Sequence, residues 1–125
     1  MHNTATQLYA NTAKKARKPR DLEADLLIKA AAKLQSVCDD WENRSRELDE
    51  ALTYNRRLWA IFASSATSPE NPLPRPIKQN IANLSLFIFN RTMSIQTDRS
   101  AQKVDKVPAL ISINREVAAG LRSAA

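Results

Sequence analysis

The chain has 125 residues, a formal net charge of +6 at pH 7, one cysteine, one histidine and one glycine. This length corresponds to one ordinary domain that can bury a core without covalent staples, and a single cysteine excludes an internal disulfide. Because tight hairpin turns need residues that tolerate positive φ, the scarcity of glycine argues against a β fold and predicts an all-α protein.

Three features of the sequence indicate the compartment. A lone cysteine suits a reducing environment. No apolar run approaches the roughly 20 residues that span a bilayer, and residues 1–20 lack the apolar segment of a secretory signal. We therefore expect a cytoplasmic protein without membrane insertion.

Residues 1–20 are basic and contain no acidic residue. Because this segment offers little apolar surface to bury, we expect a flexible basic tail; a short helix over residues 5–15 is an alternative for part of it. A basic tail is usually just solvated, although it also suits an acidic or nucleic-acid partner. The predicted helical domain comprises residues 21–125.

The first two helices are predicted over residues 21–41 and 45–64, where apolar residues recur at three- and four-residue steps. Acidic residues occupy the first turn of each, where carboxylates meet the positive end of the helix dipole. The expected core face of the first helix comprises Leu26, Ala30, Leu34, Val37 and Trp41, widened by Leu27 and Cys38. That of the second comprises Leu48, Leu52, Asn55, Trp59 and Phe62, flanked by Ala51 and Leu58. Residues 64–76 are rich in serine and proline and are predicted to form a linker.

The third and fourth helices are predicted over residues 76–95 and 107–119, with a polar loop between them. A proline suits the first turn of each helix, and Gly120 suits the C-terminal cap of the fourth. The expected core face of the fourth helix comprises Leu110, Ile111, Asn114, Val117, Ala118 and Leu121. The sequence therefore predicts a compact bundle of four principal helices.

The third helix differs from the others because it is apolar on two nearly opposite sides. One stripe comprises Ile77, Ile81, Leu84, Ile88 and Ile95, and the other comprises Leu86, Phe89 and Met93. A helix with two apolar sides is either enclosed by its bundle or partly covered by a partner. Three asparagines lie among these residues, and an enclosed helix would have to satisfy all three amides. We therefore expect Leu86, Phe89 and Met93 to form a partner-binding face, with burial in the core as the alternative.

Two asparagines lie on apolar faces, Asn55 in the second helix and Asn114 in the fourth. Each buried polar group without a hydrogen-bond partner costs roughly 1–3 kcal/mol of folding free energy. Because buried polar groups are usually satisfied internally, we expect both to be structural, each hydrogen-bonded within the domain. The alternative is a polar contact to a partner.

The sequence does not indicate catalysis. The only histidine is His2, near the chain end, and neighbouring carboxylates such as Asp49 and Glu50 diverge on a helix and suit its first turn. The sequence contains neither a glycine-rich phosphate loop nor a Cys/His cluster. We predict that the protein is not an enzyme and uses no metal or cofactor.

Several strings resemble the FlaF family of flagellar biosynthesis proteins. They are PRDLE at residues 19–23, ALTYNRRLW at 51–59, NPLP at 71–74, and LISINR at 110–115 ahead of Gly120 and Leu121. The resemblance covers about residues 8–121. It implies a cytoplasmic factor that acts on flagellin as a secretion chaperone and is associated with FlbT, a post-transcriptional regulator of flagellin messenger RNA.

The resemblance leaves two functions open. The first is an export chaperone that holds an amphipathic segment of flagellin in a groove and supports regulated flagellin synthesis. The alternative is a post-transcriptional regulator that acts on messenger RNA directly or through FlbT. The basic tail has one aromatic residue, Tyr9, so stacking on RNA bases has little support.

Deletion of residues 1–18 should leave the melting temperature within a few degrees of that of the full chain, because the segment carries few core-forming residues. Thermal denaturation followed by circular dichroism measures this. A collapse of stability would show that the segment belongs to the core.

Overall fold

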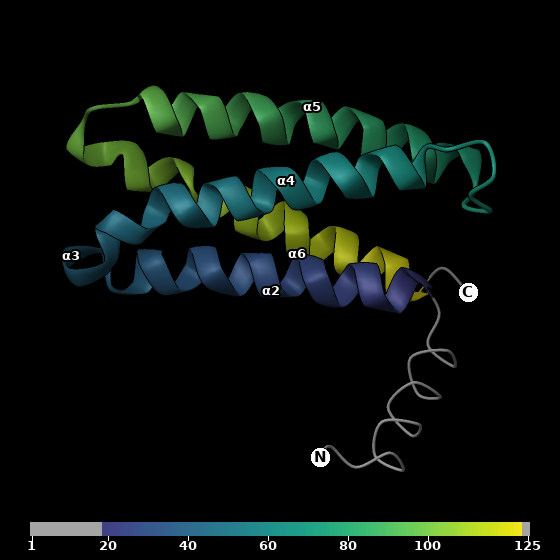
Figure 1. Ribbon diagram of the computed structural model, residues 1–125, viewed down its shortest axis with the longest axis horizontal. Coiled ribbons are helices and arrows are strands. Elements are labelled where there is room, and N and C mark those ends of the chain that lie inside the picture. The colour runs from purple at the N-terminus through teal and green to yellow at the C-terminus, as the bar shows by residue number, and fades with distance from the viewer. Residues whose placement is uncertain (1–18, 124–125) are drawn as a thin grey trace, which may run out of the picture.

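The structure is a computed structural model that describes residues 19–123, and these residues form helices and no strand (Figure 1). In chain order the elements are α2 (Pro19–Asp39), α3 (Trp41–Arg44), the 3-10 turn η1 (Ser45–Glu47), α4 (Leu48–Ala66), α5 (Arg75–Thr97), the 3-10 helix η2 (Ala101–Lys106) and α6 (Pro108–Ser123). The predicted all-α bundle of four principal helices is confirmed. The predicted tail lies almost entirely outside the described residues.

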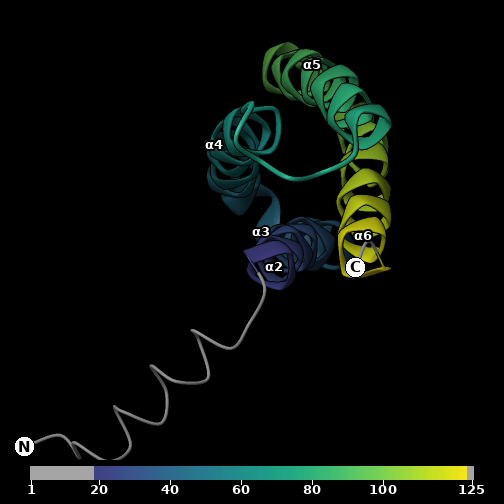
Figure 2. The same ribbon diagram turned by 90° about the vertical axis from the view of Figure 1, so that its right-hand side faces the viewer.

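The four long helices form a ring when the bundle is seen end-on, in the order α2, α4, α5, α6 (Figure 2). The packing around this ring is uneven. Helix α6 packs along α2 most extensively, α4 contacts both α2 and α5, and α5 and α6 touch each other over only a short stretch. Helix α5 is therefore held mainly by α4.

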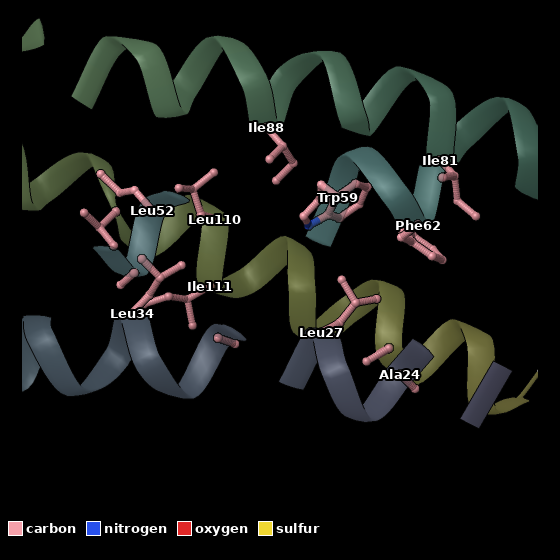
Figure 3. Packing of buried hydrophobic residues seen from close by; sticks show 14 of the residues in the cluster. Ala24, Leu27, Leu34, Leu52, Trp59, Phe62, Ile81, Ile88, Leu110 and Ile111 are labelled. Carbon is pink, nitrogen blue, oxygen red and sulfur yellow. The ribbon is translucent and has the colours of Figure 1, made fainter. Parts of the chain in front are cut away.

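The core fills the inside of the ring (Figure 3). Trp59 of α4 is fully buried and packs edge-on against Phe62, with ring centroids 5.3 Å apart. Leucines and isoleucines from all four long helices surround this pair, including Leu27, Leu34, Leu52, Ile81, Ile88, Leu110 and Ile111. Small side chains on both α2 and α6 are also fully buried, and they let these two helices pack closely.

The buried face of α2 overlaps the predicted one and extends beyond it on one side. Ala30, Leu34 and Val37 are buried as predicted, and Ala24, Leu27 and Ala31 are buried beside them. Leu27 is fully buried, whereas Leu26, expected in the core, is 42% exposed. The extensive packing against α6 accounts for the wider buried face, since Ala24 and Ala31 lie on the same side of α2 as Leu27. Trp41 lies beyond the end of α2, in α3, and is half-buried.

The fourth helix does not end at Gly120, as predicted, but continues to Ser123. Gly120 has no positive φ, so it does not form a left-handed cap. The next residue, Leu121, is buried. Burial of a leucine contributes about 1.5–3 kcal/mol, which exceeds the cost of roughly 0.5–1 kcal/mol for glycine inside a helix.

The other helix ends lie within three residues of their predicted positions, and both predicted irregular segments contain short helical turns. Residues 45–47 form η1, so α4 begins at Leu48 rather than at residue 45. The predicted loop between the third and fourth helices contains η2. Such 3-10 turns are common connectors at helix ends.

The linker between α4 and α5 is fixed by side-chain hydrogen bonds. The Asn71 amide donates to the carbonyl of Ser65 at 3.2 Å and accepts from the backbone N–H of Leu73 at 3.0 Å. Leu73 is buried in the core. Lys78 Nζ donates to the carbonyl of Ser68 at 2.7 Å, which ties the start of α5 to the linker. The NPLP string thus closes one end of the bundle.

A buried amide network joins three of the long helices. Asn114 Oδ1 accepts the indole N–H of Trp59 at 2.8 Å, and Asn114 Nδ2 donates to the carbonyl of Leu27 at 3.1 Å and to Asn55 Oδ1 at 2.7 Å. Both asparagines are fully buried. Asn55 Nδ2 finds no partner among the described residues. Asn114 therefore links α6 to α2 and α4, while Asn55 contributes a single bond.

Substitution of Gly120 by alanine should raise the free energy of unfolding by about 0.5–1 kcal/mol, because alanine restricts the unfolded chain more than glycine does. A Cβ at this position would meet nothing within 4 Å. Urea denaturation measures the change. The matched control is Ala119→Gly, an exposed neighbour in the same helix, which should lose a similar amount. A loss of stability in Gly120→Ala would contradict the expectation.

Asn114→Leu should destabilise the fold more than Asn55→Leu, within the range of roughly 1–3 kcal/mol for a lost buried hydrogen-bond partner. The first variant strands the indole N–H of Trp59 and the oxygen of Asn55. The second strands one hydrogen of Asn114 but also removes the unpaired Asn55 Nδ2. Urea denaturation of both variants tests the order. Equal losses, or an unchanged stability in Asn114→Leu, would contradict the network described above.

Candidate partner-binding surfaces

Only two of the three residues of the predicted partner-binding face on α5 are exposed on one side of the helix. Leu86 and Met93 are 63% and 65% exposed, and because they lie seven residues apart they share one side of the helix, two turns from each other. Phe89 is instead half-buried and packs against the core. The alternative of full burial therefore does not hold for Leu86 and Met93. The three asparagines among these residues, at positions 80, 83 and 90, are exposed to solvent.

A groove of about 860 Å³ lies between α2 and α4. Its lining residues come from both helices and from the turn that joins them. They are Leu26, Lys33, Ser36, Val37, Arg44, Glu47, Asp49, Glu50, Ala51, Thr53, Tyr54, Arg57, Leu58 and Ile61. We call this hollow the α2–α4 groove.

Apolar side chains concentrate at one end of the α2–α4 groove. Ile61 is 72% exposed and Leu26 is 42% exposed, while Leu58 lines the same groove, is half-buried and packs against the core. Leu22, one turn before Leu26 on the same side of α2, is also exposed. Exposed apolar residues are ordinary when isolated, but a contiguous set marks an interaction surface.

Charged side chains occupy the rest of the groove. Asp49 and Glu50 lie at the end formed by the first turn of α4, and Arg44 and Glu47 form an ion pair beside them at 3.1 Å. Further along the groove Lys33 of α2 lies over the ring of Tyr54 of α4, with Nζ 5.1 Å from the centroid. Since cation–π contacts hold the ammonium in place, the groove has a defined cationic middle.

A second, smaller groove of about 190 Å³ lies where α5 and α6 diverge. Ile77, Ile81 and Leu84 of α5 face Ile113 and Val117 of α6 across it. This hollow follows from the short contact between the two helices. Its volume accommodates a few side chains and not a helix.

The polar contacts outside the grooves are structural. Lys106 Nζ forms an ion pair with Asp98 at 2.9 Å, and hydrogen bonds from Ser100 and Lys106 hold the pKa of Asp98 well below its ordinary value. Arg91 donates to the carbonyl of Lys106 at 3.3 Å. These contacts fasten η2 to the end of α5.

The described residues show no arrangement typical of a catalytic or metal site. Burial, and then the charge of Asp39, raise the pKa of the Cys38 thiol, which disfavours the reactive thiolate. Residues 19–123 contain no group of three or more metal-binding side chains. Within the same range, no helix has the length and apolar character to cross a membrane.

Comparison with known proteins identifies the family. The model of the family described as flagellar protein FlaF matches residues 5–121. The chain belongs to the FlaF family. It is therefore a flagellar-related protein, of a family of flagellar accessory proteins. No curated protein and no solved structure matches this FlaF-family chain. The family match includes most of the segment predicted as a tail.

The sequence reasoning missed the α2–α4 groove of this FlaF-family protein. It assigned Leu26 to the core and gave no role to Ile61. One signal was available, since Ile61 lies off the stripe that runs from Leu48 to Phe62 and shares its side of the helix with Arg57. An isoleucine on a charged helix face indicates exposure, but only the packing of α2 beside α4 reveals the second wall.

Proposed function

We propose that this FlaF-family protein binds flagellin as an export chaperone, holding an amphipathic helical segment of the unassembled subunit in the α2–α4 groove. The supporting observation is a groove with exposed apolar side chains on both walls, in a member of a flagellar protein family. An amphipathic helix binds such a groove through apolar residues at three- and four-residue steps. A chaperone that covers this face keeps the subunit from associating before export.

The dimensions of the groove suit a short helix. Its lining residues on α4 run from Asp49 to Ile61, which corresponds to a length of about 18 Å, or slightly more than three helical turns. Tyr54, Leu58 and Ile61 recur at steps of four and three, so they present one continuous line of side chains to a helix lying alongside. The exposed side chains of Leu26 and Ile61 supply apolar contacts from opposite walls.

The face of Leu86, Phe89 and Met93 is the second candidate surface for flagellin and stays a prediction. It offers two exposed side chains on one convex helix, with no facing wall among the lining residues of either groove. A helix bound there would bury less apolar surface than a helix lying between α2 and α4. The groove is therefore the better supported site.

The alternative function is post-transcriptional regulation of flagellin, through messenger RNA or through FlbT. The net charge of +6 favours a polyanionic partner. Phosphate contacts weaken steeply with salt, whereas apolar groove binding does not. Comparing flagellin affinity and RNA affinity at about 50 and 200 mM salt therefore separates the two functions.

Ile61→Asp should lower the affinity for purified flagellin monomers by about tenfold or more, because it places a charge among the apolar contacts at the apolar end of the groove. Met93→Asp is the matched control, since Met93 is similarly exposed but lies on α5. It should leave the affinity unchanged within error. Isothermal titration calorimetry measures both, and circular dichroism verifies that both variants fold.

The reverse result, with binding lost in Met93→Asp and kept in Ile61→Asp, would place flagellin on the α5 face. Absence of binding by the unaltered chain would overturn the proposed function. Binding of flagellin messenger RNA that persists at high protein purity and falls steeply with salt would favour the regulatory alternative.

A further inference from the structure

We propose that the α2–α4 groove selects its helix by the order of charges along it, and this inference rests on the proposed function. The favoured occupant is an amphipathic helix with a basic residue at one end, an acidic residue about two turns further on, and an apolar turn after that. Each part of this order corresponds to one part of the groove.

The acidic end of the groove calls for a basic residue. Asp49 and Glu50 both line the groove and are exposed, and neither forms an ion pair with another described residue. Glu47 differs, because it is already paired with Arg44. Two acids in the first turn of α4 also favour the helix start. Their place in the groove wall gives them a second role, since an approaching basic side chain meets two carboxylates without partners.

The middle of the groove calls for an acidic residue. Lys33 reaches in from α2 and is held over Tyr54 of α4, and Arg57 lies one turn beyond Tyr54 on the same helix. The two cations thus line the same stretch from opposite walls. Arg57 is exposed and has no ion pair among the described residues. A carboxylate between them gains from both charges, whereas a basic residue is repelled by both.

The far end of the groove calls for an apolar turn. Leu26, Leu58 and Ile61 line it, and no acidic residue of the groove lies beyond Glu50 along α4. Asp49 and Glu50 precede Arg57 by seven or eight residues, and Ile61 follows Arg57 by four. A helix lying along α4 meets these features at nearly the same spacing, because both helices rise about 1.5 Å per residue.

The same charges disfavour two other occupants. Residues 1–18 of the chain contain basic residues and no acid, so this segment has nothing to pair with Lys33 and Arg57. A second copy related by a twofold axis would lay its α4 antiparallel to the first. If Arg57 of one copy meets Glu50 of the other, Ile61 lies against the charged residues 46 and 47 of that copy. Only a separate helix with the stated order satisfies all three parts of the groove.

The test uses two fluorescein-labelled designed helical peptides and the full chain. Both peptides carry the same apolar stripe. The matched peptide has lysine at one position, glutamate seven residues later and leucine four residues after that, and the reversed peptide exchanges the lysine and the glutamate. Fluorescence anisotropy at low salt should show that the matched peptide binds about tenfold more tightly than the reversed peptide. This is the difference expected when several exposed charge pairs each contribute a little.

Two variants make the test specific to the groove. The double variant Asp49→Lys with Glu50→Lys should bind the reversed peptide as tightly as the matched peptide, or more tightly. The neutral double variant Asp49→Asn with Glu50→Gln should lose part of the discrimination, because Lys33 and Arg57 still favour the matched peptide. The control Asp105→Asn removes an exposed acid of η2, outside the groove, and should leave the discrimination intact. Circular dichroism verifies that the variants fold. If the two lysines destabilise α4, the neutral double variant provides the test on its own.

Equal affinity for the two peptides, absence of binding by either, or discrimination that neither groove variant reduces would overturn the inference. A dimer that dissociates when peptide is added would point to a second copy as the normal occupant and would also overturn it. These outcomes are separate from the proposed function. Flagellin binding that is lost in Ile61→Asp while the peptides bind equally keeps the function and removes only the charge order.

Discussion

The amide of Asn114 is the contact on which the arrangement of the bundle depends. It must receive the Trp59 indole and reach both the Leu27 carbonyl and the Asn55 oxygen at the same time. A shift of one residue in any of the three helices would leave polar groups unpaired in a fully buried site. The network therefore sets the register of α2 and α4, and with it which side chains face each other across the groove between them.

The unequal packing of the ring explains where surfaces are left open. Close contact between α2 and α6 buries the side of α2 that carries its alanines and Leu27, and Leu26 is left outside the core on the wall of the groove. Ile61 lies on the other wall. Helix α5, held mainly by α4, leaves a narrow gap toward α6. The α2–α4 groove is thus a consequence of how the core closes, because Leu26 and Ile61 are left outside the core on its two walls.

The sequence predicted the helices well because each carries a strong periodic stripe, and the core face of α4 from Leu48 to Phe62 is buried as expected. The prediction failed where the burial of a residue, or the end of a helix, depends on tertiary packing. Leu26 and Leu27 are equally apolar and both belong to the predicted stripe, so only the packing of α2 in the bundle shows that Leu27 is buried and Leu26 is exposed. Gly120 suits a C-terminal cap in the sequence, but the helix continues past it because Leu121 is buried in the core. The charge order of the groove was out of reach, since Lys33 meets Tyr54 only in the folded bundle.

The central claim is that a flagellin helix lies between α2 and α4. Nuclear magnetic resonance spectra of the isotopically labelled chain, recorded with and without unlabelled flagellin monomers, test it most directly. The account predicts that the backbone amide signals of Lys33, Tyr54 and Ile61 shift or broaden on binding, while those of Leu86 and Met93 stay in place. Changes confined to Leu86, Met93 and their neighbours on α5, with the groove signals unmoved, would contradict it.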